Sequence, residues 1–174
     1  GDALFEELMA AVGIRAPRSE NKLIAAVLWE RGRLHMRGLS FQLRASDQIA
    51  PEQRKRMDLL EVLRTATTGH DPLRSVVFGT QFLRLALDAG EPLRIIRGLS
   101  GSAMASASET SARARANTHE LLSRAQRLLA QHDGARERLH YNVACATVAF
   151  YRSELREVLA PAVEAERAYR ELVL

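Results

Sequence analysis

The chain has 174 residues, of which 47% are hydrophobic, so it is long enough to bury a substantial core and too apolar to be disordered throughout. Its formal net charge is +4, but 21 acidic residues are interspersed among 25 basic ones, which favours solvated helix surfaces over a nucleic-acid footprint. Ala, Leu and Arg dominate and aromatic residues reach only 5%, a composition that predicts helix nearly everywhere.

Cys145 is the only cysteine, which excludes an intrachain disulfide and a thiolate metal cluster and suits a reducing cytoplasm. The sequence has no run of about 18 apolar residues that would span a membrane, and its acidic start does not resemble a signal peptide. Because Gly1 stands where a native chain begins with Met, we expect a piece of a longer protein, with a single helical-repeat region over residues 1–174.

The first expected helix covers residues 2–14, where Leu4, Leu8 and Val12 recur every four residues. A longer helix is predicted from an N-cap at Ser19 to about Arg37. It has two apolar stripes, one of Leu23, Val27 and Leu34 and the other of Ala25, Ala26, Trp29 and Met36. Two stripes predict burial on two sides, so Trp29 is expected in the core.

Residues 38–51 form the longest irregular segment, which we interpret as a loop held by Phe41 because no partner strand is visible elsewhere. Pro51 then begins a helix that is expected to end near residues 67–70. Its inward residues are expected to be Leu59, Leu60, Leu63 and Ala66. Its outward residues are expected to be Arg54, Lys55, Asp58 and Glu61.

Residues 71–99 predict two helices joined by a tight turn. Asp71 is a good N-cap, and Pro72 suits the first helical position. Gly90 suits the left-handed residue that ends a helix, and Pro92 begins the next one. The first of the two helices has two apolar stripes, so we expect it inside a helical stack. The stripes comprise Leu73, Val76, Val77, Leu83 and Leu87 on one side and Phe78, Phe82 and Leu85 on the other.

The remaining sequence predicts the boundaries of the later helices. The second helix of the pair is expected to continue to about Ala107, with a break near residues 109–111. A capping box at Asn117 and Glu120 predicts the next helix start, and residues 133–134 end that helix. The helix after it is expected to bury Leu139, Val143, Ala146, Thr147 and Phe150. A last helix begins near Ser153, and Pro161 is expected to kink or split it.

Helix pairs that begin near residues 72, 117 and 153 have a period of about 35 to 45 residues, which is typical of antiparallel helix-pair repeats. We therefore predict an all-α fold of about eight helices, arranged as a right-handed solenoid similar to tetratricopeptide repeats (TPR-like). A closed helical bundle is the rival architecture.

The sequence predicts no catalytic, cofactor-binding or metal-binding residue and no cofactor. Glycine-rich phosphate-binding motifs are absent, and residues 98–102 (GLSGS) lack the GxSxG spacing of a nucleophile elbow. His119, His132 and His140 are expected to be surface or capping residues, and Cys145 a small buried hydrophobe. The densest basic patch is a candidate surface for an acidic partner and comprises Arg113, Arg115, Arg124, Arg127, Arg136 and Arg138.

Several stretches together resemble one protein family. They are LWERGRLHMRGLSF (28–41), PEQRKRMDLL (51–60), DPLRSVVFGTQFLRLALDAGEPLRIIRGL (71–99) and, more weakly, AFYRSELREVL (149–159). In this order they resemble the C-terminal helical region of large bacterial serine/threonine protein kinases, in which a kinase domain and an AAA/STAND-type ATPase module precede a TPR-like array. The sequence departs from that family at Arg152 and Ser153, where the family tends to have Gly and an aromatic residue. The resemblance implies a regulatory or partner-binding region and transfers no catalytic residue.

The leading expectation is a non-catalytic, cytoplasmic helical-repeat module that binds protein partners, or relays a signal to a kinase and an ATPase on the same polypeptide. A second hypothesis is a ligand-sensing domain, as in ATP-dependent transcriptional regulators, that holds a small molecule in the groove of the array. A third is nucleic-acid binding through the arginine patch. No membrane contact is expected of these residues, and the oligomeric state is left open.

Overall fold

The computed structural model describes Met9 and residues 19–173, and this part of the chain is entirely helix, turn and loop. The elements in chain order are α2 (Glu20–Arg37), a 3₁₀ turn η1 (Ser46–Gln48), α3 (Pro51–Thr67), α4 (Pro72–Ala89), α5 (Pro92–Ala105), α6 (Ala112–Leu129), α7 (Ala135–Tyr151) and α8 (Leu155–Val173). The helix predicted over residues 2–14 lies outside the described residues, apart from Met9, which is helical and buried. The predicted all-α fold is confirmed.

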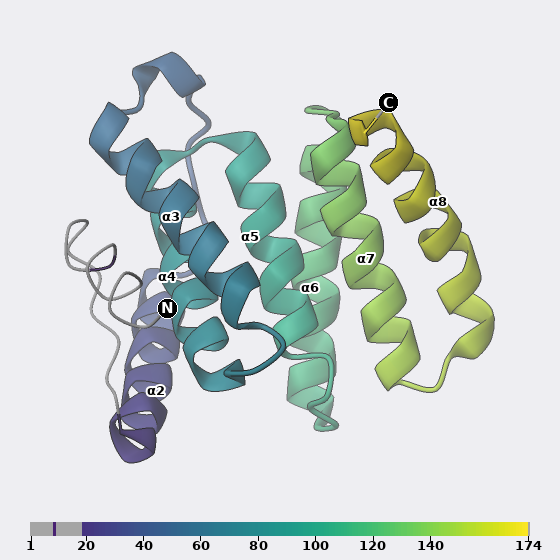
Figure 1. The fold of residues 1–174 in the computed structure, drawn as a ribbon, viewed down its shortest axis with the longest axis horizontal. Coiled ribbons are helices and arrows are strands. Elements are labelled where there is room, and N and C mark those ends of the chain that lie inside the picture. Colours follow the sequence, from purple (N-terminus) through teal and green to yellow (C-terminus); the bar gives the residue numbers. More distant parts are fainter. Residues whose placement is uncertain (1–8, 10–18, 174) are drawn as a thin grey trace.

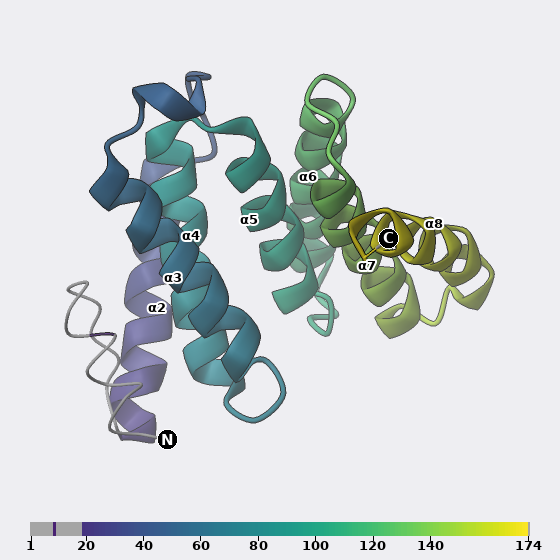
Figure 2. The same ribbon diagram turned by 45° about the horizontal axis from the view of Figure 1, so that its top comes forward.

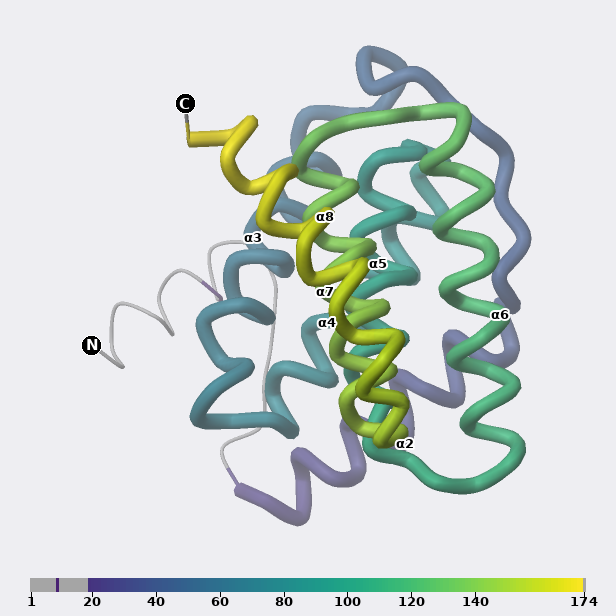
Figure 3. Tube along the Cα trace, turned by 90° about the vertical axis from the view of Figure 1, so that its right-hand side faces the viewer, coloured from purple at the N-terminus to yellow at the C-terminus, as the bar shows by residue number. Residues whose placement is uncertain are grey.

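Successive helices pack as pairs, α3 with α4, α5 with α6 and α7 with α8. In Figure 1, α3, α5 and α7 lie side by side at the front, with α4 and α6 behind them. Helix α2 lies against α4 at one end, and Figure 2 and Figure 3 show α8 as the outermost helix at the other. This arrangement is consistent with a helical repeat array. The pairs begin at Pro51, Pro92 and Ala135 rather than at the predicted positions, with a spacing of about 40 residues.

The structure confirms the predicted hairpin over residues 71–99. The carboxylate of Asp71 accepts a hydrogen bond from the Arg74 N–H at 3.0 Å, which caps α4. Gly90 is left-handed (φ 79°, ψ 14°), and its N–H donates to the Ala86 carbonyl at 2.9 Å. Helix α4 packs against α2, α3 and α5. It is therefore an interior helix, as its two apolar stripes predict.

The core lies mainly around α4 and α5, where the large side chains are almost completely buried. They include Phe78, Phe82, Leu83, Leu87, Ile95, Ile96 and Leu99. The loop between α2 and α3 closes over this core, with Leu39 and Phe41 packed against it, as expected for a loop that Phe41 holds in place.

The prediction that α2 buries two faces is wrong. Trp29 is 65% exposed and Met36 is 78% exposed, whereas Leu23 is buried. Within the described residues α2 packs against α4 alone, so one apolar stripe suffices for that contact and the other faces outward.

The inward and outward faces of α3 also differ from the prediction at two positions. Ala66 is exposed, and Glu61 is buried at 4% exposure. A carboxylate in this position needs partners, and α5 and α7 supply them, as described below.

Two boundaries and one register require correction in the C-terminal half. Helix α6 begins at Ala112 rather than near Asn117, because the Ser111 hydroxyl accepts a hydrogen bond from the Ala114 N–H at 3.1 Å and caps the helix earlier. Helix α8 runs through Pro161 without being split.

The register of α7 is shifted from the one predicted. Its buried residues include Ala144, Val148 and Ala149, whereas Val143 and Phe150 are exposed. Alanine side chains are small, so α5 and α8 can pack closely against this face of α7. The larger Val143 and Phe150 therefore lie on the outside of the helix. None of the helices within the described ranges combines the length and apolar character that a membrane crossing requires.

Candidate functional site

The most unusual feature of the described chain is a set of buried charges between α3, α5 and α7. The Arg97 Nη1 of α5 donates to Glu61 Oε2 of α3 at 2.5 Å, and Arg97 Nε lies 3.3 Å from Glu137 Oε1 of α7. The three side chains are only 5–7% exposed. One guanidinium therefore joins three helices through two carboxylates.

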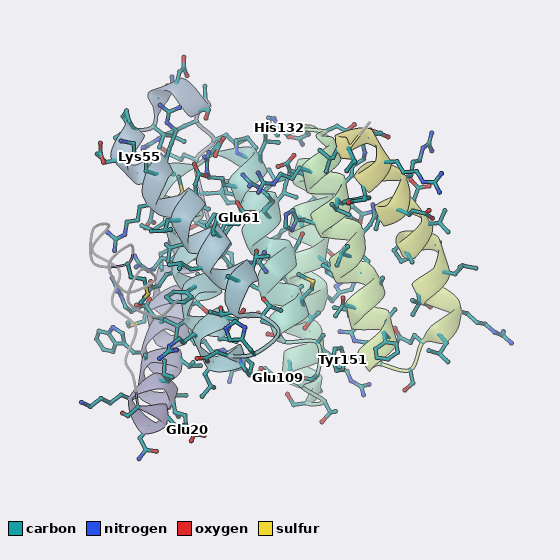
Figure 4. All side chains as sticks on the ribbon, in the orientation of Figure 1. Glu20, Lys55, Glu61, Glu109, His132 and Tyr151 are labelled. Atoms are coloured by element: carbon teal, nitrogen blue, oxygen red, sulfur yellow. The ribbon has the colours of Figure 1, made fainter. Side chains whose placement is uncertain are left out.

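These charges follow a regular spacing along two helices. Asp58 and Glu61 are three residues apart on α3, and Arg94 and Arg97 are three residues apart on α5. Arg94 Nη2 donates to Asp58 Oδ1 at 2.6 Å, so the two helices form successive ion pairs with the same sequence separation of 36 residues. The backbones of α3 and α5 do not approach closely, and Figure 4 shows Glu61 in the space between them. We call this arrangement the ion-pair ladder.

The ladder extends to α7 through Arg136 and His140. Arg136 Nη2 lies 3.7 Å from Glu61 Oε2, and His140 Nε2 lies 3.6 Å from Glu61 Oε1. Burial lowers the pKa of His140 to about 4, and the guanidiniums of Arg64, Arg97 and Arg136 act in the same direction. Glu61 opposes this shift without overcoming it, so His140 is neutral at pH 7.

Arg64 occupies the next position on α3, three residues after Glu61, and has no carboxylate within 4.0 Å among the described residues. Its Nε is buried without a hydrogen-bond partner. Burial lowers the pKa of this guanidinium, Arg97 acts in the same direction, and Glu61 opposes both.

Two glycines make room for the Arg64 side chain. A Cβ on Gly79 of α4 would lie 3.0 Å from Arg64 Cδ, and one on Gly101 of α5 would lie 3.3 Å from Arg64 Nη1. The side chain therefore rests against two helix backbones, which restricts its position.

The six arginines of the predicted basic patch lie on several surfaces. Helical spacing places Arg113, Arg124 and Arg127 on one side of α6 and Arg115 on another. Arg124 pairs with Glu120 at 2.8 Å and donates to the Leu39 carbonyl at 3.0 Å. On α7, Arg136 joins the ladder, whereas Arg138 pairs with Asp133 and with Glu171 of α8. The assignment of these arginines to a partner surface stays a prediction.

The other candidate residues of the sequence are three histidines, Ser100 and Cys145. His119 is exposed as predicted, whereas His140, expected at the surface or in a cap, is partly buried beside Glu61 because α7 packs against α5. Within the described residues no group of three or more His, Cys, Asp or Glu side chains is arranged to hold a metal ion. Ser100, of the GLSGS segment, lies inside helix α5 and is fully buried. Cys145 is half-buried rather than buried as predicted. Burial raises the pKa of its thiol, which keeps it protonated at neutral pH.

Sequence reasoning missed the ladder because it assigned Glu61 to the solvent face, where Asp58 does lie, and did not bring α3 next to α5. The signal was present in the spacing, since Asp58, Glu61 and Arg64 are matched by Arg94, Arg97 and Ser100 at a constant offset. Such an offset is informative only once α3 and α5 are known to lie side by side.

Two further features are open to solvent. An open pocket of 590 Å³, lined by apolar and charged residues, lies between the loop before α3, the start of α5 and the α6–α7 turn, and Figure 4 labels His132 at that turn. Its lining includes Leu43, Pro92 and Leu93. Helix α8 also presents an uncovered apolar stripe, in which Leu155 is 67%, Leu159 is 70% and Val163 is 51% exposed.

No protein-family model matches the chain, and no curated protein or solved structure matches it either.

Proposed function

We propose that this chain is a non-catalytic helical-repeat module that mediates protein–protein interaction or relays a signal within a larger bacterial serine/threonine kinase and ATPase polypeptide. The observation that carries the proposal is the exposed stripe of α8. Contiguous apolar surface of this kind marks interaction sites on proteins. Leu155, Leu159 and Val163 recur every four residues, so they form one ridge that a partner helix or sheet face would cover.

The kinase and ATPase context rests on the resemblance of residues 28–41, 51–60 and 71–99. Sequencing the coding region on both sides of these residues tests it directly. A kinase domain and an ATPase module in the same reading frame support the relay, and their absence contradicts it. The non-catalytic part is tested by assaying the purified chain for ATP hydrolysis and phosphoryl transfer, and turnover above that of a heat-inactivated sample overturns it.

The interaction surface is tested by photo-crosslinking in the intact protein. A benzoylphenylalanine placed at Leu159 reports on the apolar stripe, and one at Glu164 serves as the matched control on a charged side of the same helix. We expect a discrete crosslinked product from position 159 that is absent from 164 and is lost when Leu155→Lys is added. No product, or equal products from both positions, contradicts a docking role for this stripe.

A second candidate function is favoured by the 590 Å³ pocket, whose volume suits a small molecule. In this alternative the array is a ligand sensor. A thermal-shift screen against metabolites separates the two, because a saturating ligand stabilises the native state by mass action. A shift above about 2 °C that Leu93→Arg removes supports the sensor. A screen without such a shift supports the interaction module.

A further inference from the structure

The ion-pair ladder has a third position whose charge has no counterpart. Its first two positions pair Asp58 with Arg94 and Glu61 with Arg97. Three residues further along each helix, α3 contributes Arg64 while α5 contributes Ser100, and the next residue, Gly101, lies against the Arg64 guanidinium. At this third position α3 therefore carries a guanidinium instead of a carboxylate, and the facing residues of α5, Ser100 and Gly101, carry no carboxylate.

The buried polar groups around this position are incompletely satisfied. Ser100 is fully buried. Its hydroxyl, the Nε of Arg64 and the Oε1 of Glu61 are buried atoms that have no hydrogen-bond partner among the described residues. Most buried polar atoms in folded proteins are paired, and a buried charge without a partner is destabilising. A position that is costly to the fold and held in place by two glycines is typical of a binding site.

The charge balance indicates which anion fits. Three guanidiniums, those of Arg64, Arg97 and Arg136, surround two carboxylates, those of Glu61 and Glu137. His140 adds no charge at pH 7. At the other end of the ladder Arg94 is already matched by two carboxylates, those of Asp58 and Glu91. The charges around Glu61 and Arg64 alone have an excess of one positive charge, which a carboxylate neutralises. A phosphate dianion would bring a second negative charge next to Glu61.

We propose that Arg64 binds a carboxylate of an acidic peptide segment from a partner protein, which completes the third position of the ladder. This inference rests on the proposed function for the identity of the partner as a protein. Guanidinium and carboxylate match in geometry and form two parallel charge-assisted hydrogen bonds. Arg136, which is 56% exposed, adds attraction from the adjacent helix. The front layer of α3, α5 and α7 is where an extended segment would run (Figure 1).

The test uses fluorescein-labelled decapeptides of alternating Gly and Glu, of Gly and Gln, and of Gly and phosphoserine, with anisotropy measured up to about 1 mM protein. We expect the Glu peptide to bind at least about tenfold more tightly than the Gln peptide, which is the scale of one charge-assisted pair. Arg64→Gln should weaken the Glu peptide by about tenfold. The matched control, Arg113→Gln on the exposed side of α6, should change it less than about twofold.

Equal affinity for the Glu and Gln peptides, no binding of either, or an Arg64→Gln protein that binds like the parent overturns the inference. Tighter binding of the phosphoserine peptide than of the Glu peptide overturns the choice of a carboxylate. If the Glu peptide does not bind while the crosslink from position 159 forms, this inference fails and the interaction module stands. If the peptide binds but the crosslink does not form, the docking role of the α8 stripe is contradicted and this inference stands.

A purely structural role for Arg64 predicts a different pattern. If Arg64 serves only to hold helices together, Arg64→Gln lowers the melting temperature, and its loss of binding is a loss of folded protein. If the third position is a binding site, Arg64→Gln melts at the same temperature as the parent or higher, because a buried unpaired charge has been removed. Arg64→Lys should retain the charge and recover only part of the affinity, since an ammonium cannot form the parallel pair.

Discussion

Gly90 lies where the α4–α5 turn meets the loop before α3, and its replacement by Ala perturbs both. A Cβ at this position would lie 2.0 Å from the Gln42 carbonyl oxygen, which no real pair of atoms tolerates. The Gly90 carbonyl also accepts a hydrogen bond from the Arg44 N–H at 2.9 Å. The loop must therefore move away, and this hydrogen bond is then lost.

The magnitude follows from two terms. A left-handed conformation costs an Ala residue about 1–2 kcal/mol relative to Gly, and a lost backbone hydrogen bond costs about 1 kcal/mol. Gly90→Ala should therefore lower the free energy of unfolding by about 2–3 kcal/mol. For a chain of this length that corresponds to a fall in Tm of about 4–12 °C. Urea denaturation gives the free energy, and calorimetry gives the Tm.

Two glycine variants serve as controls. Gly32→Ala lies in α2 with nothing within 4 Å of the new Cβ, so it should be neutral or stabilise by up to about 1 kcal/mol. Gly38→Ala has a positive φ of 73° but the same open space, so it adds backbone strain without a collision. Hydrogen exchange should show loss of protection at the Arg44 amide only in Gly90→Ala. Unchanged melting of Gly90→Ala, or unchanged protection of Arg44, refutes the reasoning.

The remaining predictions concern the charges. Arg97→Met should lower the free energy of unfolding by about 3–5 kcal/mol in urea denaturation, because it leaves Glu61 and Glu137 buried without their cation; a loss below about 1 kcal/mol contradicts the ladder. The pKa of His140 is about 4 in the folded chain and about 6.5 in the unfolded one, so the unfolded state binds the proton more tightly. Stability should therefore be complete above pH 6.5 and fall by up to about 3 kcal/mol as the pH decreases towards 4, and His140→Gln should remove that part of the pH dependence. If the parent and this variant have parallel pH profiles, His140 is not held neutral. The chain should pass through a heparin column at about 0.15 M salt, since several of its arginines are already paired with carboxylates; retention that ends only at high salt would support nucleic-acid binding instead.

The sequence predicts the structure correctly where the conformation depends on residues close together along the chain. Asp71 caps a helix through its own side chain, and Gly90 takes a conformation that other residues avoid. Both act within a few residues along the chain, so the 71–99 hairpin and its turn were predicted to the residue. The loop at residues 38–51 was also predicted, because its pattern fits neither a helix nor a paired strand.

Burial was predicted less well where it depends on which helices become neighbours. Trp29 is exposed because α2 contacts only α4 within the described residues, a fact that the pattern of α2 does not contain. Glu61 is buried because Arg97 and His140 approach it from two other helices. A charged residue is assigned to the solvent face by default, and only tertiary contacts reverse that assignment.

The candidate site was missed for the same reason. The predicted patch consists of arginines that are close together along the chain, whereas the ladder joins residues that are 36 positions apart. Arg136 is the single residue of the predicted patch that reaches it.

The measurement that bears most directly on the proposed site is the NMR resonance of the Arg64 Nε–H during a titration with the Glu decapeptide. A carboxylate that completes the third position of the ladder should shift this resonance saturably, while the Arg97 Nε–H, which donates to the Leu93 carbonyl and lies 3.3 Å from Glu137 Oε1, stays nearly unchanged. Arg113, on the exposed side of α6, should not respond. Absence of a shift at Arg64, or a shift of similar size at Arg113, contradicts the account.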